Sequence, residues 1–167
     1  MTTAPSGRLI RHPGSADLIL TRHFRAEVGD VWASVTEPER TARWFGPWQG
    51  EAAQGRTIKV QMAYDEGTPW VDMRVEACRA PQRLVLATGE SDGNWLIELL
   101  LADTDGRTEL SLIHHGVPID GVHEFGPGWE FYLDMLVASR EGGDPPSYDD
   151  YYESMKGYYD GLVRDPA

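Results

Sequence analysis

Apolar and polar residues alternate along much of the chain, and this two-residue period is typical of β-strands with one buried face. In the first such stretch, Leu18, Leu20, Arg22 and Phe24 fall on one side. Turn-forming Gly, Asp, Asn and Pro residues separate the later stretches, which predicts hairpin connections. After the first strand we expect an antiparallel meander of about six strands. The clearest alternating stretches are 17–25, 57–64, 70–77, 83–88, 95–101 and 108–115.

Two short helices are expected directly after the first strand. Val31, Trp32 and Val35 share one face at helical spacing, which predicts the first of them. Pro38 suits the first turn of the second helix, which we expect to run to Trp44. Pro47 prevents that helix from continuing.

The hydrophobic period changes from two residues to three or four after Gly116. Apolar residues then recur at Trp129, Leu133, Leu136 and Val137, which predicts a long helix with one apolar face. We expect Gly126-Pro127-Gly128 to be the turn that enters this helix and Gly142-Gly143 to end it.

A second C-terminal helix is predicted beyond a Pro-rich linker. It carries five of the seven tyrosines, and four of them form an aromatic stripe with a methionine and a leucine. This stripe favours packing onto the chain's own domain, although a homodimer face or a protein-partner surface remains an alternative. The stripe consists of Tyr148, Tyr151, Tyr152, Met155, Tyr159 and Leu162, with Tyr158 beside it.

This order of elements predicts an α+β fold in which a curved antiparallel sheet wraps around the long helix. An apolar sheet face must be covered, and the long helix is the only expected element large enough to cover it. Because such a sheet is strongly twisted, one helix leaves a gap, and the two short helices would close its mouth. We expect a flexible arm over 1–16, the main domain over 17–141, and a linker with the tail helix over 142–167.

Four segments, taken in order, resemble one known superfamily. VWASVTEPERTARWFGP, VEACRAPQRLVLAT, TELSLIHHGV and GPGWEFYLDML are similar to elements of the SRPBCC superfamily, whose fold is shared by START domains and the birch-pollen allergen. The nearest branch is the one similar to the C-terminal domain of the heat-shock-protein-90 ATPase activator. The resemblance covers about residues 18–140 and implies the helix-grip fold, which carries several different functions.

Composition and charge narrow the partners. The chain has 15 Lys and Arg against 27 Asp and Glu, a net charge of −12, so it repels phosphate backbones and anionic lipid. We therefore expect neither nucleic acid nor a membrane as a partner. The single cysteine, Cys78, excludes an internal disulfide. The first residues lack the apolar core of a signal peptide, and no apolar run is long enough for a membrane span, so we expect a cytoplasmic protein.

The interior between sheet and long helix is the candidate ligand site. Its expected wall contains aromatic rings that follow the Pro38 helix, methionines that adapt to varied ligands, and inward residues of the later strands and the long helix. The same residues are also what an ordinary filled core would contain. The candidate wall residues are Trp44, Phe45, Met62, Met73, Trp95, His114, Trp129 and Leu133.

Arg22 and His114 are the candidate polar anchors for a ligand. Arg22 alternates with inward apolar residues, and a buried arginine needs an internal carboxylate or an anionic ligand. His114 is expected to point inward and His115 outward, because consecutive strand residues face opposite ways. His114 is then a hydrogen-bonded core residue, a pocket fixture or a general base.

Three classes of function follow from these residues. We favour a binding protein for a small apolar or aromatic ligand, with no metal and no cofactor. A regulator that binds a protein partner, as the resemblance to the ATPase activator implies, is the first alternative. A cyclase-like or hydrolase-like enzyme that uses His114 is the second, although no second catalytic group is evident.

Overall fold

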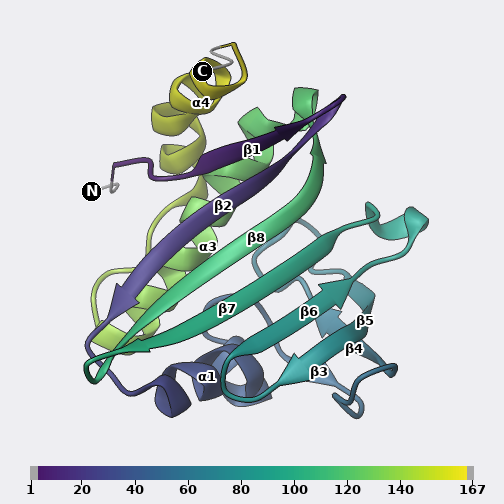
Figure 1. Ribbon diagram of the computed structural model, residues 1–167, viewed down its shortest axis with the longest axis vertical. Coiled ribbons are helices and arrows are strands. Elements are labelled where there is room, and N and C mark those ends of the chain that lie inside the picture. Colours follow the sequence, from purple (N-terminus) through teal and green to yellow (C-terminus); the bar gives the residue numbers. More distant parts are fainter. Residues whose placement is uncertain (1–3, 165–167) are drawn as a thin grey trace.

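The computed structural model describes residues 4–164, and in this part of the chain one antiparallel sheet of eight strands is the main element (Figure 1). Its strand order is β1-β2-β8-β7-β6-β5-β4-β3, so strands consecutive in sequence lie side by side except β2 and β3, and β8 pairs with β2. The strands are β1 (Arg8–His12), β2 (Ser15–Phe24), β3 (Trp48–Gln49), β4 (Thr57–Gln61), β5 (Trp70–Arg79), β6 (Arg83–Ala87), β7 (Leu96–Thr104) and β8 (Arg107–Pro118).

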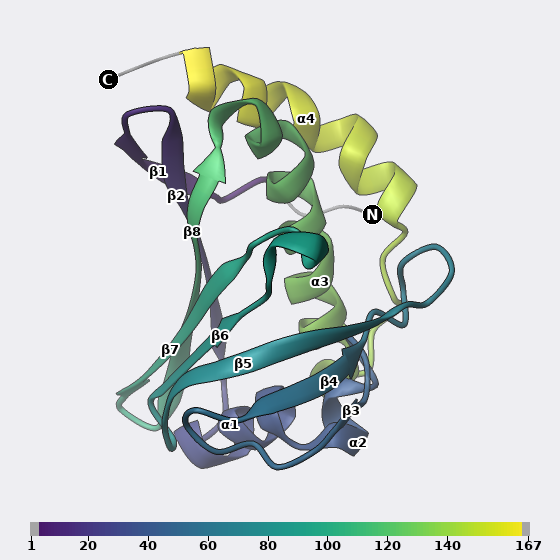
Figure 2. The same cartoon turned by 90° about the vertical axis from the view of Figure 1, so that its right-hand side faces the viewer.

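Within residues 4–164, four α-helices accompany the sheet. α1 (Val28–Thr36) and α2 (Pro38–Thr41) follow β2, and α3 (Val122–Glu141) follows β8. α4 (Tyr148–Arg164) is the last element, and two short 3₁₀ helices lie at Glu90–Asp92 and Ile119–Gly121. Figure 2 shows that the twisted sheet curves around α3, while α1 and α2 lie below one end of it. The predicted α+β helix-grip fold is confirmed.

The alternation of the expected strands places the core on the concave face of the sheet. Leu18 and Leu20 of β2, Val75 of β5 and Leu110 of β8 are fully buried there. Their strand neighbours point to the convex face, which is the arrangement that a two-residue period requires. α3 closes the core from the other side through Leu133 and Leu136.

The expected flexible arm over 1–16 is wrong for its second half. Arg8–His12 forms β1 and pairs antiparallel with β2, which itself begins at Ser15. Gly14 supplies the tight turn between them with φ of 76°, a conformation that other residues adopt only with strain. This strand is too short and too polar for its alternation to stand out in the sequence. The other expected domain limits stay a prediction.

The start of the long helix also differs from expectation. Gly126-Pro127-Gly128 lies inside α3, which begins at Val122. Pro127 cannot donate a backbone hydrogen bond there, but its fixed φ is compatible with a helix early in its course. The expected end is confirmed, because Gly142 adopts φ of 77° and donates to the Ala138 carbonyl oxygen.

The tail helix α4 packs onto α3. Tyr151, Met155 and Tyr159 of the aromatic stripe are buried, whereas Tyr148 and Tyr158 are partly exposed. The ring of Tyr159 covers Gly126 so closely that a Cβ atom on this glycine would overlap it. Packing of the tail within its own chain is therefore what the structure contains.

Candidate functional site

An apolar pocket of about 280 Å³ lies in the core, between the strands β4–β8, the α1–α2 segment and Trp129 of α3. Val75 and Leu112, which are essentially unexposed, form part of its floor. Ala52 and Cys78 also line the pocket and are exposed, so they mark where it reaches solvent. The pocket is therefore deep and opens at one end.

The lining of this pocket carries no charged residue. Its side chains are apolar or aromatic apart from Thr36, Thr41 and Cys78. Both threonine hydroxyls already donate to backbone carbonyls of their own helices, Thr36 to Trp32 and Thr41 to Pro38. The pocket thus offers few polar groups and suits an apolar occupant.

The aromatic residues after α2 are held by hydrogen bonds to α1. The indole Nε1 of Trp44 donates to the Ser34 carbonyl oxygen at 2.9 Å, and that of Trp48 donates to the Thr36 carbonyl oxygen at 2.8 Å. These carbonyls belong to the last turn of α1, where no helical partner exists. The indole N–H groups are therefore satisfied, and the rings are left to line the pocket.

Gly46 allows this aromatic segment to approach β4. A Cβ atom at this position would overlap the Gln61 carbonyl oxygen. No larger residue fits without moving the backbone, so the close approach of Phe45 and the neighbouring tryptophans to the sheet depends on glycine here.

Five of the eight expected wall residues line the pocket. These five are Trp44, Phe45, Met73, Trp95 and Trp129. The other three do not line it. Met62 is buried and lines a neighbouring groove, and Leu133 packs within the hydrophobic core. His114 is hydrogen-bonded to Trp129. Whether any of them contacts a ligand stays a prediction.

His114 is an almost unexposed histidine that accepts a hydrogen bond. The Trp129 Nε1 donates to His114 Nδ1 at 3.0 Å, so Nδ1 carries no proton and the neutral ring is protonated on Nε2. Burial, with a smaller effect of His115, lowers the pKa of His114 to about 4. Of the three roles expected for His114, this geometry fits that of a hydrogen-bonded core residue. His114 affects the pocket by orienting the Trp129 ring.

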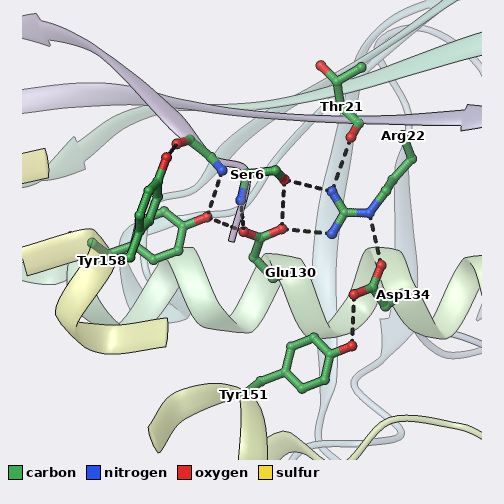
Figure 3. Close-up of polar contacts among 9 residues, drawn as sticks. Ser6, Thr21, Arg22, Glu130, Asp134, Tyr151 and Tyr158 are labelled. Carbon is green, nitrogen blue, oxygen red and sulfur yellow. Dashed lines mark hydrogen bonds and ion pairs between the residues drawn. The ribbon is translucent and has the colours of Figure 1, made fainter. Parts of the chain in front are cut away.

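Arg22 points inward as expected, but it lies away from the pocket. Its guanidinium contacts Glu130 Oε1 at 2.7 Å and Asp134 Oδ1 at 2.9 Å, both on α3 (Figure 3). Burial alone would lower the pKa of Arg22, but these hydrogen bonds and charges outweigh it and raise that pKa. An internal carboxylate pair, and not an anionic ligand, satisfies this arginine.

The carboxylates of Glu130 and Asp134 extend this polar network to the tail helix and the N-terminal segment. Glu130 accepts from the Ser6 backbone N–H at 2.6 Å and from the Tyr159 hydroxyl at 2.7 Å. Asp134 accepts from the Tyr151 hydroxyl at 2.8 Å. Figure 3 shows that the network joins β2, α3 and α4 with the segment before β1.

Several pocket residues were not among the expected wall residues. Ile58 and Val60 of β4 share a face with Met62, and Leu84 of β6 and Leu99 of β7 also point inward. Strand alternation identifies all of them as inward residues. It does not distinguish residues that border a void from residues that pack against each other.

Within residues 4–164, no group of three or more His, Cys, Asp or Glu side chains is arranged to hold a metal ion. In the same range, none of the helices combines the length and the apolar character that crossing a membrane requires.

Comparison with known proteins gives a clear family and several related structures. The profile of the family described as Activator of Hsp90 ATPase homolog 1-like protein matches residues 25–140. The crystal structure of CalU16 from Micromonospora echinospora is 23% identical, covers 99% of this chain and 100% of its own, and superimposes with a TM-score of 0.77. No curated protein matches.

Two further structures share the fold. The solution structure of the BPP1335 protein from Bordetella parapertussis is 18% identical, with a TM-score of 0.73 and coverage of 96% of this chain and 94% of its own. DynU16, described as a protein in the dynemicin biosynthetic locus, is 24% identical with a TM-score of 0.65. The match to DynU16 covers 77% of this chain and 48% of that one.

Proposed function

This chain belongs to the Activator of Hsp90 ATPase homolog 1-like family, and on that premise we propose that it binds a small apolar or aromatic molecule in the apolar pocket. Folds of this kind commonly hold a ligand between sheet and helix. The observation that carries the proposal is the pocket of about 280 Å³, which is lined by apolar and aromatic side chains and open at one end.

The size of the pocket sets the size of its occupant. An apolar cavity of roughly 150 Å³ is enough for benzene, so this pocket has room for a larger aromatic body. Burial of roughly 200 Å² of apolar surface contributes on the order of 5 kcal/mol before association costs. We therefore expect dissociation constants between millimolar and micromolar for simple aromatic probes.

The two alternatives have less support. A partner surface built from the tail tyrosines would need them exposed, yet Tyr151 and Tyr159 are buried against α3. A general base at His114 would need to face the pocket, but this residue is not part of its lining. Ligand binding without chemistry is the function that the geometry favours.

The proposal is tested by looking for a ligand and then by filling its site. Native mass spectrometry of freshly purified protein should detect a retained small molecule. Titration with the neutral fluorescent probe N-phenylnaphthylamine should give saturable binding. Leu86 lines the pocket on β6, so Leu86→Trp should weaken the probe by about tenfold or more.

Leu100→Trp is the matched control. Leu100 is a partly exposed leucine on β7 that does not line the pocket, so the same substitution there should leave probe binding unchanged. The proposal fails if no ligand is retained and the probe does not bind. It also fails if both tryptophan variants bind the probe as well as the original chain does.

A further inference from the structure

A second concave surface lies beside the apolar pocket and differs from it in chemistry. This acidic groove, of about 560 Å³, is bordered by the first turns of α3, the loop between β4 and β5, and the start of α4. Figure 2 shows that loop extending beside the start of α4. Trp95 and Trp129 line both the groove and the apolar pocket, so the two sites share a wall.

Aromatic rings form the walls of the acidic groove and are fixed by contacts among themselves. Phe131 meets Tyr148 edge to face, with ring centroids 5.6 Å apart, and it meets Tyr132 at 5.2 Å. On the other side, Trp95 meets Phe125 edge to face at 5.6 Å. The rings are thus positioned before any ligand arrives, and this lowers the cost of binding.

Four carboxylates lie among these rings, and the groove lining contains no Lys, Arg or His. They are Asp65, Glu66, Glu124 and Asp149. The Tyr132 hydroxyl donates to Asp65 Oδ1 at 2.7 Å, which fixes that carboxylate at the wall. Glu124 lies 3.9 Å from the imidazole of His123, which is outside the lining.

The electrostatic effect of these carboxylates is evident at Tyr148. Burial raises the pKa of the Tyr148 hydroxyl, and the charges of Glu124 and Asp65 raise it further. Burial opposes a charge of either sign, whereas the carboxylate contribution disfavours a further negative charge in the groove and favours a positive one.

We propose that the acidic groove binds a small organic cation, a protonated amine or a quaternary ammonium group. Aromatic faces attract such cations through their quadrupoles, and carboxylates at the same surface add Coulomb attraction. A bare metal ion fits less well, because no three acidic, histidine or cysteine side chains converge within residues 4–164. The groove thus differs from the apolar pocket, whose lining has no charge to pair with a cation.

The test compares two probes of the same shape. Choline carries a quaternary ammonium group, and neohexyl alcohol is its uncharged carbon isostere. Binding to the full chain is followed by NMR shifts of the tryptophan indole N–H groups. We expect choline to bind at least about fivefold more tightly than neohexyl alcohol, and added salt to weaken choline alone.

Charge-removing variants locate the site. The triple variant Glu66→Gln, Glu124→Gln and Asp149→Asn should weaken choline by about tenfold. The control triple variant Asp72→Asn, Glu76→Gln and Glu109→Gln removes the same net charge from exposed carboxylates outside the groove and should have little effect. Tyr148→Leu keeps every charge and removes one ring, and it should weaken choline by a few-fold.

Three outcomes overturn the proposal: equal affinity for the two probes, equal losses in the two triple variants, or loss of choline binding in Leu86→Trp. The last result would place the cation in the apolar pocket. The inference is independent of the proposed function, because choline binding in the groove stands even if N-phenylnaphthylamine does not bind in the pocket.

Discussion

Two neighbouring faces of α3 are both covered by other parts of the chain, but one is apolar and the other carries paired charges. Trp129 and Leu133 point to the sheet side, where the apolar core contains an unfilled pocket. Glu130 and Asp134, each one residue further along and so turned by about 100°, point to the side covered by β2 and α4. That side buries charges, but they are joined to each other and to several hydroxyls.

The two sides differ in whether their buried groups already have partners. In the polar network, Arg22, Glu130 and Asp134 satisfy one another, and no buried side-chain nitrogen or oxygen within residues 4–164 lacks a hydrogen-bond partner. On the other face the pocket lining is apolar, and its side chains lack van der Waals contacts on the side of the void. The network is therefore structural, and the pocket is the part of the interior that a ligand would complete.

Removal of Arg22 should have the largest effect. In Arg22→Met the carboxylates of Glu130 and Asp134 stay buried without their cation, so we expect a loss of about 3–5 kcal/mol in the free energy of unfolding. Denaturant unfolding at neutral pH measures it. Arg22→Lys keeps the charge but cannot contact both carboxylates as the guanidinium does, so its free energy of unfolding should lie between those of the original chain and Arg22→Met. A loss below about 1 kcal/mol for Arg22→Met would show that the network is solvated.

Acid should destabilise the folded protein through His114, which contacts Trp129 on the apolar face of α3. The pKa of this residue is lowered to about 4 in the folded protein, against an ordinary value of 6.5. Between pH 6.5 and pH 4, His114 is protonated in the unfolded chain but stays neutral in the folded chain. The free energy of unfolding therefore falls as the pH drops, and the decrease is complete near pH 4. The total is about 3 kcal/mol.

His114→Gln isolates this contribution, because a glutamine oxygen can still accept from Trp129 but does not titrate. The difference in unfolding free energy between the two proteins should change with pH, while the effects of Asp17, Asp30 and Glu98 cancel. These three carboxyls have lowered pKa values and also lose stabilisation in acid. A difference that stays constant from pH 7 to pH 4 contradicts the assignment.

A single methyl group tests how tightly the covered side is packed. A Cβ at Gly126 overlaps the Tyr159 ring, so Gly126→Ala should lower the free energy of unfolding by about 1–3 kcal/mol. Gly128 is two residues away in the same helix and has open space around its would-be Cβ. Gly128→Ala should therefore be neutral or stabilise by up to about 1 kcal/mol through helix propensity. Equal effects would mean that α4 does not hold Tyr159 against α3.

The sequence revealed the apolar side of this comparison better than the polar side. The spacing of Trp129, Leu133 and Leu136 identified the buried stripe of α3, and strand alternation identified Met73 and Leu99 as inward residues. This works because one buried face leaves a periodic signal. Family resemblance then supplied the shape of the fold and the region where a pocket belongs.

The polar side left no such signal. Glu130 and Asp134 lie beside the apolar stripe of α3, and the sequence pattern alone is that of solvent-exposed residues. In the structure they are covered by α4 and by the segment before β1. Arg22 was identified as an inward residue, but its partners lie more than a hundred positions away in the chain. The pocket could not be predicted from the sequence pattern either, because a filled core and a hollow core show the same alternation of apolar and polar residues.

The smallest expected effect tests whether the two faces act independently. A ligand that binds only the folded chain stabilises it by about 1.4 kcal/mol when its free concentration is ten times the dissociation constant. We expect N-phenylnaphthylamine to give this increment in the original chain and in Arg22→Lys alike, because its pocket shares no residue with the network. Independent sites add within about 0.5 kcal/mol. An increment that disappears in Arg22→Lys would mean that α3 shifts as a unit, so that the paired charges on one face set the width of the pocket on the other.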